Sequence, residues 1–312
     1  MFCIRGRLAP SPSGRMHLGN AFSALLSWLS VRSSNGELVL RIEDLDVQRC
    51  KAEYSEQLID DLKWLGIDWD ISGKDYFQSQ RSDIYEEYLS RLISSHDAYP
   101  CFCSRSQRLA ASAPHADEYS AATPCPCLAL SREKIIQKYN FSSPSIRLKV
   151  PNRTFEFDDG VFGKTCLNPA NCCGDVILRR SDGMFAYQLA VVVDDALMGI
   201  NQVIRGRDLL ESTPVQIHLN NLLGFTPPEY SHIPLLLAPD GKRLSKREKS
   251  LDFGSLRSMF APEELLGLLA HLAGIIDSPK NISLEELLCE FTLSKIARQD
   301  IYLPEKFCNR ID

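Results

Sequence analysis

The sequence predicts an α/β fold in which a cysteine-rich insertion divides a domain with a parallel sheet. Three observations support this prediction. A strand, a helix and a second strand follow one another before residue 45, cysteines and prolines gather between residues 99 and 182, and apolar helix and strand patterns return after residue 183. A strand–helix–strand unit of this length places its two strands parallel in one sheet.

The first half of this domain has strong local signals. In the run "CIRGRLA", Arg5 and Arg7 alternate with Ile4 and Leu8, which is typical of a strand. An apolar helical pattern follows and stops at Asn35-Gly36, a strong turn signal. The expected elements are a strand at 3–9, a helix at 17–33, a strand at 37–44 and helices at 52–65 and 82–95.

The insertion carries short β-like runs, "SIRLKVP" and "TFEFDD", between its prolines and cysteines. After it we expect strands near 189–193 and 202–205 and a helix at 209–223, and we expect the tail from Pro262 onward to be helical. The predicted divisions are residues 1–98 and 183–254 for the two halves of the α/β domain, 99–182 for the insertion and 255–312 for a helical region.

Composition narrows the class of protein. The chain has 312 residues, 44% of them hydrophobic, which suffices for a sizeable core. Its N-terminus is too charged for a signal peptide, and it has no apolar run of about 18 residues, so we expect a cytoplasmic protein with no membrane partner. The net charge of −5 does not indicate general affinity for nucleic acid, although a local basic surface could supply it.

The loop "APSPSGRMHLGN" joins the first strand to the first helix. Unpaired N–H groups and the helix dipole favour an anion at such a helix start, and Gly14 and Gly19 allow close approach. His17 could donate to a phosphoryl oxygen, or it could simply cap a proline-stiffened turn. The loop matches neither the P-loop nor the dinucleotide fingerprint.

A second motif, "DGKRLSKREKS", follows a strand-like run. Five basic residues fall within positions 242–249, namely Lys242, Arg243, Lys246, Arg247 and Lys249. A basic loop beside a sheet suits a polyphosphate that gains charge as a bond breaks, although a solvated basic loop is the alternative.

Together the two motifs resemble the HIGH and KMSKS signatures of class I aminoacyl-tRNA synthetases. Further blocks, among them "LRIEDLD", "DLKWLGIDWD", "YPCFCSR" and "FAYQLAVVVDDALMGINQVIRGRDLL", resemble the glutamyl branch of that family. The resemblance extends from about residue 5 to residue 296, with the blocks in the expected order.

This resemblance implies a class I Rossmann-like domain that binds ATP, with magnesium arriving on the nucleotide. His17 and Lys246 are the implied catalytic residues, and Lys246 would stabilise the departing pyrophosphate. The implied ATP-binding residues are Pro10, Ser11, Gly14, His17, Gly19, Asn20, Arg243, Leu244, Ser245 and Lys246.

The same resemblance implies a site for L-glutamate. Glutamate has two carboxylates and an ammonium group, so its site needs cations and an anion. Arg7 and Arg205 could each bind a carboxylate, Glu43 could pair with the ammonium group, and Tyr187 could donate through its hydroxyl. The implied set is Arg7, Ala9, Ser11, Glu43, Tyr187 and Arg205.

The cysteines of the insertion suggest one structural zinc ion. Cys101 and Cys103 are close enough in sequence to share an ion, and Cys125 or Cys127 could add a third thiolate. The family resemblance implies Cys101, Cys103, Tyr119 and Cys125 as ligands. The gap after Tyr119 is longer than in the family, so His115 is an alternative to Tyr119, and a metal-free cysteine knuckle is an alternative to the whole site.

The expected RNA substrate is inferred from the segment of the chain that follows the second motif. About 65 residues follow Lys246, and they resemble the helical linker of the family and not its anticodon-binding region. Short members of this branch attach glutamate to queuosine at the wobble position of tRNA(Asp), and Asn20, in place of the second histidine of HIGH, suits them. The alternatives are a shortened enzyme that charges tRNA(Glu) and a catalytically silent RNA-binding paralogue. We expect a monomer.

Overall fold

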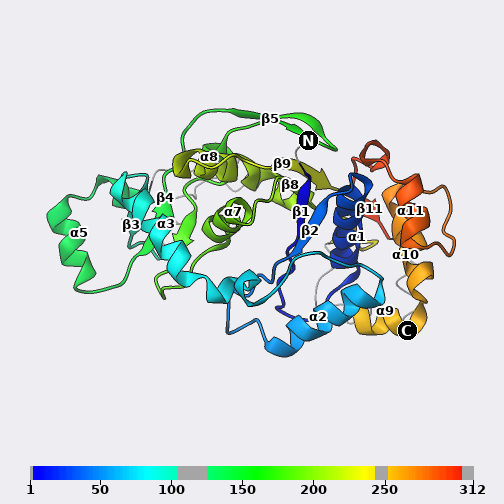
Figure 1. Ribbon diagram of the computed structural model, residues 1–312. Coiled ribbons are helices and arrows are strands. Elements are labelled where there is room, and N and C mark those ends of the chain that lie inside the picture. The colour runs from blue at the N-terminus through cyan, green and yellow to red at the C-terminus, as the bar shows by residue number, and fades with distance from the viewer. Residues whose placement is uncertain (1–2, 105–124, 243–251, 304–312) are drawn as a thin grey trace.

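Two pairs of parallel strands form the centre of the molecule. The computed structural model describes residues 3–104, 125–242 and 252–303. Strand β1 (Arg5–Leu8) pairs in parallel with β2 (Glu37–Leu40), and β8 (Gln202–Gly206) pairs in parallel with β9 (Glu229–Ile233). The two pairs lie side by side, and the Asn201 N–H donates to the Arg5 carbonyl where they meet (Figure 1). The predicted α/β fold is confirmed.

Helix α1 (Leu18–Ser33) connects β1 to β2 and supplies much of the core. Its N-cap is His17, and its apolar face, which includes Phe22, is buried against the strands. The helix ends where the sequence predicts, because Asn35 adopts a φ of 51° and the Gly36 N–H caps the carbonyl of Val31. A side chain at Gly36 would collide with the Ile4 carbonyl, at 2.5 Å from the added Cβ.

The remaining elements complete the α/β domain, the insertion and the C-terminal region. The other helices are α2 (Ala52–Trp64), α3 (Ser82–Ser94), α5 (Arg132–Tyr139), α6 (Pro169–Cys172), α7 (Tyr187–Leu197), α8 (Thr213–Leu223), α9 (Phe253–Met259), α10 (Pro262–Ala273) and α11 (Leu284–Glu290). The other strands are β3 (Ala98–Cys101), β4 (Ser145–Leu148), β5 (Phe155–Asp159), β6 (Gly163–Leu167), β7 (Ile177–Arg179), β10 (Leu236–Leu237) and β11 (Ile301–Tyr302).

The insertion contains antiparallel strands, in contrast to the parallel centre. Strand β4 lies between β3 and β7, and β5 and β6 form a separate hairpin. Figure 1 shows β3, β4 and α5 at one end of the molecule, whereas α10 and α11 pack at the other end, beyond α1. The hairpin crosses the top of the view and lies against β9, so the insertion also contacts the central strands.

Three sequence predictions for the chain after residue 183 differ from the structure. Residues 189–193, predicted as a strand, belong to helix α7, which is apolar and buried along most of its length. The tail is not wholly helical, because β11 pairs in parallel with β10. The predicted helix at 209–223 is divided into a 3₁₀ segment (Arg207–Ser212) and α8.

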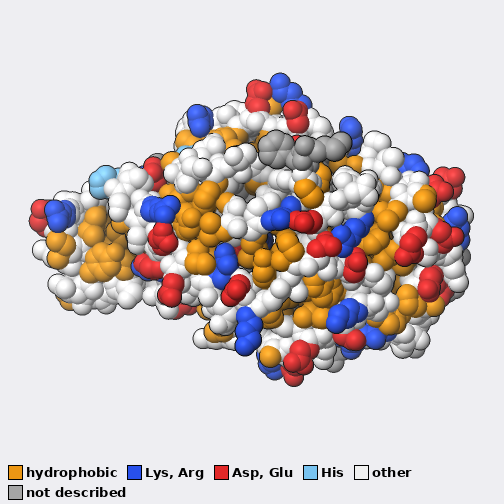
Figure 2. Space-filling view, in the orientation of Figure 1, with side chains coloured by type: hydrophobic (Ala, Val, Ile, Leu, Met, Phe, Trp, Pro, Cys, Tyr) orange, Lys and Arg blue, Asp and Glu red, His pale blue; other side chains and the backbone are white. Residues whose placement is uncertain are grey.

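The surface is mixed in charge. Figure 2 shows acidic and basic side chains interspersed over one face, in keeping with 35 basic and 40 acidic residues in the chain. Apolar side chains gather at the end that carries α5, where Phe141 is 88% exposed. Within the three described segments, no helix has the length and apolarity that crossing a membrane requires.

Candidate functional site

A cavity of about 230 Å³ lies at the carboxyl ends of β1 and β8. This edge of a parallel sheet is where ligands bind in open α/β folds. Both halves of the chain line the cavity, because its walls come from β1, the loop before α1, α1, the segment after β2, α2, α7, β8 and the 3₁₀ segment after β8. Its lining residues are Arg7, Leu8, Ala9, Pro10, Met16, Asn20, Ser23, Ala24, Ser27, Glu43, Leu62, Tyr187, Ile204, Arg205, Gly206 and Leu209.

Two buried arginines supply positive charge to this cavity. Arg7 and Arg205 are 6% and 4% exposed. Arg7 donates to the Ile204 carbonyl, and its Nε lies 3.7 Å from Asp195 without a hydrogen-bond partner among the described residues. No described carboxylate forms an ion pair with Arg205. A buried cation such as Arg7, with an unpaired N–H, or Arg205, with no anionic partner among the described residues, is suited to an anionic ligand.

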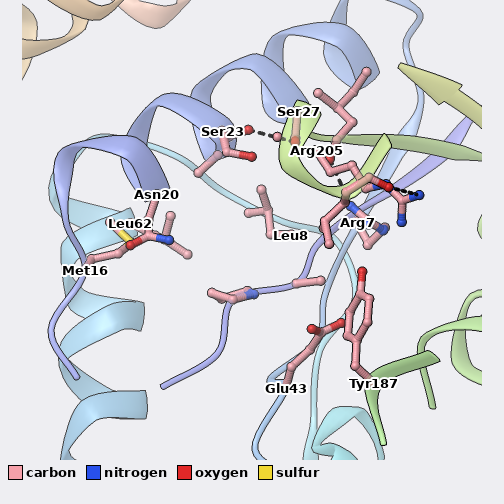
Figure 3. A pocket seen from close by; sticks show the side chains of 16 residues that line it. Arg7, Leu8, Met16, Asn20, Ser23, Ser27, Glu43, Leu62, Tyr187 and Arg205 are labelled. Atoms are coloured by element: carbon pink, nitrogen blue, oxygen red, sulfur yellow. Dashed lines mark hydrogen bonds between the residues drawn. The ribbon is translucent and has the colours of Figure 1, made fainter. Parts of the chain in front are cut away.

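Glu43 and Tyr187 face the arginines from the other side of the cavity. Figure 3 shows the Tyr187 hydroxyl pointing toward Arg7, with the Glu43 carboxylate beside it. Burial raises the pKa of Glu43, against the opposing effect of Arg41 and Arg7, and a ligand ammonium group would favour its charged form. Burial also raises the pKa of Tyr187, so its hydroxyl remains a donor. Two cations, one anion and one hydroxyl therefore surround the cavity.

Glu43 is held by a buried ionic network that the sequence analysis did not identify. Arg41 is fully buried and contacts Glu43 at 3.0 Å and Asp195 at 2.6 Å. Asp194, also fully buried, pairs with Arg81 at 2.7 Å and accepts hydrogen bonds from Gln78 and Tyr85. The acidic pair after the apolar run "LAVVV" is the sequence signal that could have indicated this network.

His17 caps α1. Its Nδ1 accepts from the Gly19 N–H at 3.1 Å, and its own backbone N–H donates to Asn20 Oδ1 at 3.1 Å. Glycine gives the His17 ring room at this position, because an added Cβ would lie 3.1 Å from the ring, a tight contact. With Nδ1 as an acceptor, the neutral imidazole carries its proton on Nε2. His17 can therefore cap the helix through Nδ1 and donate to a phosphoryl oxygen through Nε2.

The structure brings together part of the predicted site. Of the predicted glutamate residues, all but Ser11 line the cavity, and of the predicted ATP residues, Pro10 and Asn20 line it. Ser11, Gly14, His17 and Gly19 lie in the adjoining loop and helix start, where Gly14 has a φ of 151° that favours glycine. Outside the described residues lie Arg243, Leu244, Ser245 and Lys246.

Four cysteines form a cluster in the insertion, beginning at the end of β3. The sulfur atoms of Cys101, Cys103, Cys125 and Cys127 lie within 4.8 Å of one another. The separations of 3.5, 3.9 and 3.6 Å for 101–125, 103–125 and 103–127 match the spacing of about 3.8 Å that four thiolates adopt around tetrahedral zinc. The cluster could hold one metal ion.

The surroundings of the cluster suit a cation. Burial and the neighbouring thiols raise the pKa of Cys103 and Cys125, and a metal ion would reverse this by stabilising thiolates. The Phe102 N–H donates to Cys127 Sγ at 3.4 Å. The sequence analysis offered either Cys125 or Cys127 as a ligand, and the structure places both in the cluster. The other two candidates, Tyr119 and His115, lie outside the described residues.

Comparison with known proteins shows which family the chain belongs to. Residues 3–272 match the family model "tRNA synthetases class I (E and Q), catalytic domain". The chain is 47% identical to the glutamyl-Q tRNA(Asp) synthetase of Nitratidesulfovibrio vulgaris over 88% of this chain and 87% of that protein. It is 44% identical to the protein of the same name from Symbiobacterium thermophilum, over 97% and 96% of the two chains.

Glutamate–tRNA ligases are also similar. The ligase of Aquifex aeolicus is 43% identical over 86% of this chain, which covers 57% of that enzyme. The crystal structure of a glutamate tRNA ligase from Elizabethkingia meningosepticum in complex with its amino acid superposes with a TM-score of 0.82 at 28% identity, covering 99% of this chain and 69% of the other.

Proposed function

This chain belongs to the class I tRNA synthetase family for glutamate and glutamine, and we propose that it joins L-glutamate to the queuosine base of tRNA(Asp) at the expense of ATP. The activation of glutamate is supported above all by the cavity in which Arg7, Arg205, Glu43 and Tyr187 complement the charges of a free amino acid. The queuosine acceptor is supported by the relatives with 47% and 44% identity, which bear the name glutamyl-Q tRNA(Asp) synthetase.

The reaction has two steps. A glutamate carboxylate oxygen attacks the α-phosphorus of ATP, the bond to pyrophosphate breaks, and glutamyl-adenylate forms. A hydroxyl of queuosine then attacks the activated carbonyl, loses its proton and releases AMP. Catalysis therefore depends on positioning the reactants and stabilising charge.

The charged and hydroxyl side chains of the cavity, together with the two motifs, have proposed roles in the first step. Arg7 and Arg205 bind the carboxylates, Glu43 binds the ammonium group and Tyr187 donates a hydrogen bond. The loop with Pro10, Ser11 and Gly14 and the start of α1 at His17, Gly19 and Asn20 receive the nucleotide, whose magnesium neutralises phosphate charge. Arg243, Leu244, Ser245 and Lys246 are proposed to bind the departing pyrophosphate.

We propose that the chain is a cytoplasmic monomer divided as the sequence predicts. Antiparallel strands between two parallel pairs support an insertion at 99–182 between catalytic halves at 1–98 and 183–254. A tRNA substrate is consistent with a cytoplasmic location.

The acceptor is tested by charging with ATP, labelled glutamate and two bulk tRNA pools, one containing queuosine and one lacking it. We expect label only in the queuosine pool, migrating with tRNA(Asp). Equal labelling of tRNA(Glu) in both pools would establish a translation enzyme instead. Absence of glutamate-dependent pyrophosphate exchange would indicate a silent paralogue.

We propose that the cysteine cluster holds one structural zinc ion. Its spacing supports Cys101, Cys103 and Cys125 as ligands and favours Cys127 over Tyr119 as the fourth. Metal analysis of the purified protein is expected to find about one zinc per chain, with Cys127→Ser losing most of it and Tyr119→Phe retaining it. Cys166→Ser, at an exposed thiol outside the cluster, serves as the control.

A protein purified without zinc would contradict this assignment. Loss of zinc from Tyr119→Phe, with retention in Cys127→Ser, would restore the set Cys101, Cys103, Tyr119 and Cys125. Chelation is also expected to lower the melting temperature, because binding energy at a structural site contributes to folding.

A further inference from the structure

The guanidinium group of Arg205 is held at each nitrogen by an uncharged partner. Nε donates to His232 Nε2 at 3.0 Å, Nη1 to Gln216 Oε1 at 2.6 Å and Nη2 to Thr213 Oγ1 at 2.8 Å. The guanidinium also lies over the Tyr230 ring, 4.9 Å from its centroid. These contacts fix the orientation of the group without neutralising its charge.

His232 connects Arg205 to a buried carboxylate. Its Nδ1 lies 2.5 Å from Asp159 Oδ2, and both side chains are 0% exposed. Asp159 also accepts hydrogen bonds from the backbone N–H groups of Val161, Phe162 and His232. A carboxylate held in this way fixes the proton of His232 on Nδ1, which leaves a lone pair on Nε2 for the Arg205 N–H.

We propose that Asp159 and His232 are positioning residues that orient Arg205 toward a carboxylate of the glutamate substrate. This inference rests on the proposed function. The imidazole lies between the two charges, so Asp159 balances the charge of Arg205 without occupying the face that meets the ligand. A carboxylate in direct contact would compete with the substrate.

The alignment requires a neutral imidazole. A protonated His232 would direct an N–H at the Nε–H of Arg205 and remove the acceptor. Burial lowers the pKa of His232, and Arg205 and Arg7 act in the same direction, whereas the hydrogen bond that His232 donates to Asp159 opposes them. The neutral form is therefore favoured at neutral pH.

The positioning carboxylate belongs to the insertion. Asp159 ends β5, and the next residue, Gly160, donates its N–H to the Tyr230 carbonyl on β9. An added Cβ on Gly160 would lie 2.1 Å from Ser231 Oγ, so the turn after β5 packs directly against the Ser231 side chain of β9. The end of the hairpin is thus fixed against the strand that carries His232, and the insertion contributes to the amino-acid site.

The test is glutamate-dependent ATP–pyrophosphate exchange, with separate KM values for glutamate and ATP. His232→Leu, which removes the acceptor, is expected to raise the KM for glutamate by about 10- to 100-fold, the range for losing a hydrogen bond to a charged group. We expect kcat and the KM for ATP to change less than about threefold. His232→Gln, which can present an amide oxygen to Arg205, is expected to recover most of the affinity.

Asp159→Asn removes the charge with little change in shape and is expected to raise the KM for glutamate about 10-fold. Its matched control is Asp158→Asn, next to it and exposed, and His218→Leu on α8 is the control for His232→Leu. Melting temperatures identify variants that do not fold. If His232→Leu does not fold, the KM for glutamate of Asp159→Asn decides whether the inference holds.

Unchanged KM values for glutamate in the folded His232 and Asp159 variants would overturn this inference. Equal rises in the KM for both substrates, with no recovery in His232→Gln, would also overturn it, because they would indicate a general structural effect. A wild-type protein without glutamate-dependent exchange would instead refute the proposed function.

Discussion

Replacing Arg205 by methionine is expected to lower kcat/KM for glutamate in pyrophosphate exchange by about 10²- to 10³-fold. The side chain is buried at the wall of the cavity, and methionine fills a similar volume without charge or donors. Loss of one partner from a buried, hydrogen-bonded ion pair has a cost of roughly 2–5 kcal/mol, because the remaining charge is left desolvated. In Arg205→Met, the carboxylate of the bound glutamate would be this remaining, desolvated charge.

The measurement needs a control that separates charge at the site from charge elsewhere. Arg207 follows two residues later, is 42% exposed and pairs with Asp300 at 3.4 Å, so Arg207→Met is expected to change kcat/KM by less than about threefold. Arg205→Lys is expected to give an intermediate value, because lysine keeps the charge but lacks the planar fork. Wild-type kinetics in Arg205→Met would remove this residue from the glutamate site.

Replacing Lys246 by alanine is expected to lower the rate of adenylate formation by about 10²-fold or more while glutamate binding remains nearly intact. Negative charge accumulates on the departing pyrophosphate, and a lysine that meets this charge acts mainly in the transition state. Single-turnover measurement of adenylate with saturating glutamate and ATP isolates this step, and calorimetric titration measures glutamate affinity.

Lys242→Ala is the matched control for this substitution. Lys242 lies in the same basic run, is 81% exposed and pairs with Asp240, so its removal is expected to have little effect. An unchanged rate in Lys246→Ala would exclude the lysine from the chemistry. A large loss of glutamate affinity would assign it a role in binding.

The first strand, helix and second strand could be predicted because their signals are local. Apolar spacing defines the buried face of α1, and the Asn35-Gly36 turn ends it by a backbone conformation that few residues adopt. The paired strands begin and end within a few residues of their predicted bounds because both are short and buried. Such signals act within one element and do not depend on its neighbours.

Residues 189–193 show where local signals fail. A run of β-branched valines favours a strand in isolation, yet the segment is the core of α7. The helix is buried against α3 and α8, so apolar residues cover more than one of its faces and its amphipathic period is obscured. Packing on several sides, which a single segment does not encode, determined its conformation.

The sequence by itself could name charged and hydroxyl groups of the cavity: residue types and the family resemblance together implied Arg7, Glu43, Tyr187 and Arg205, and all four line it. The tertiary structure decided what holds them. Arg41 donates to Glu43, and Asp159 is linked to Arg205 through His232, which lies 73 residues from Asp159 in the chain. Hydrogen-bond geometry depends on atoms within about 3 Å, and that proximity arises only when distant segments pack together.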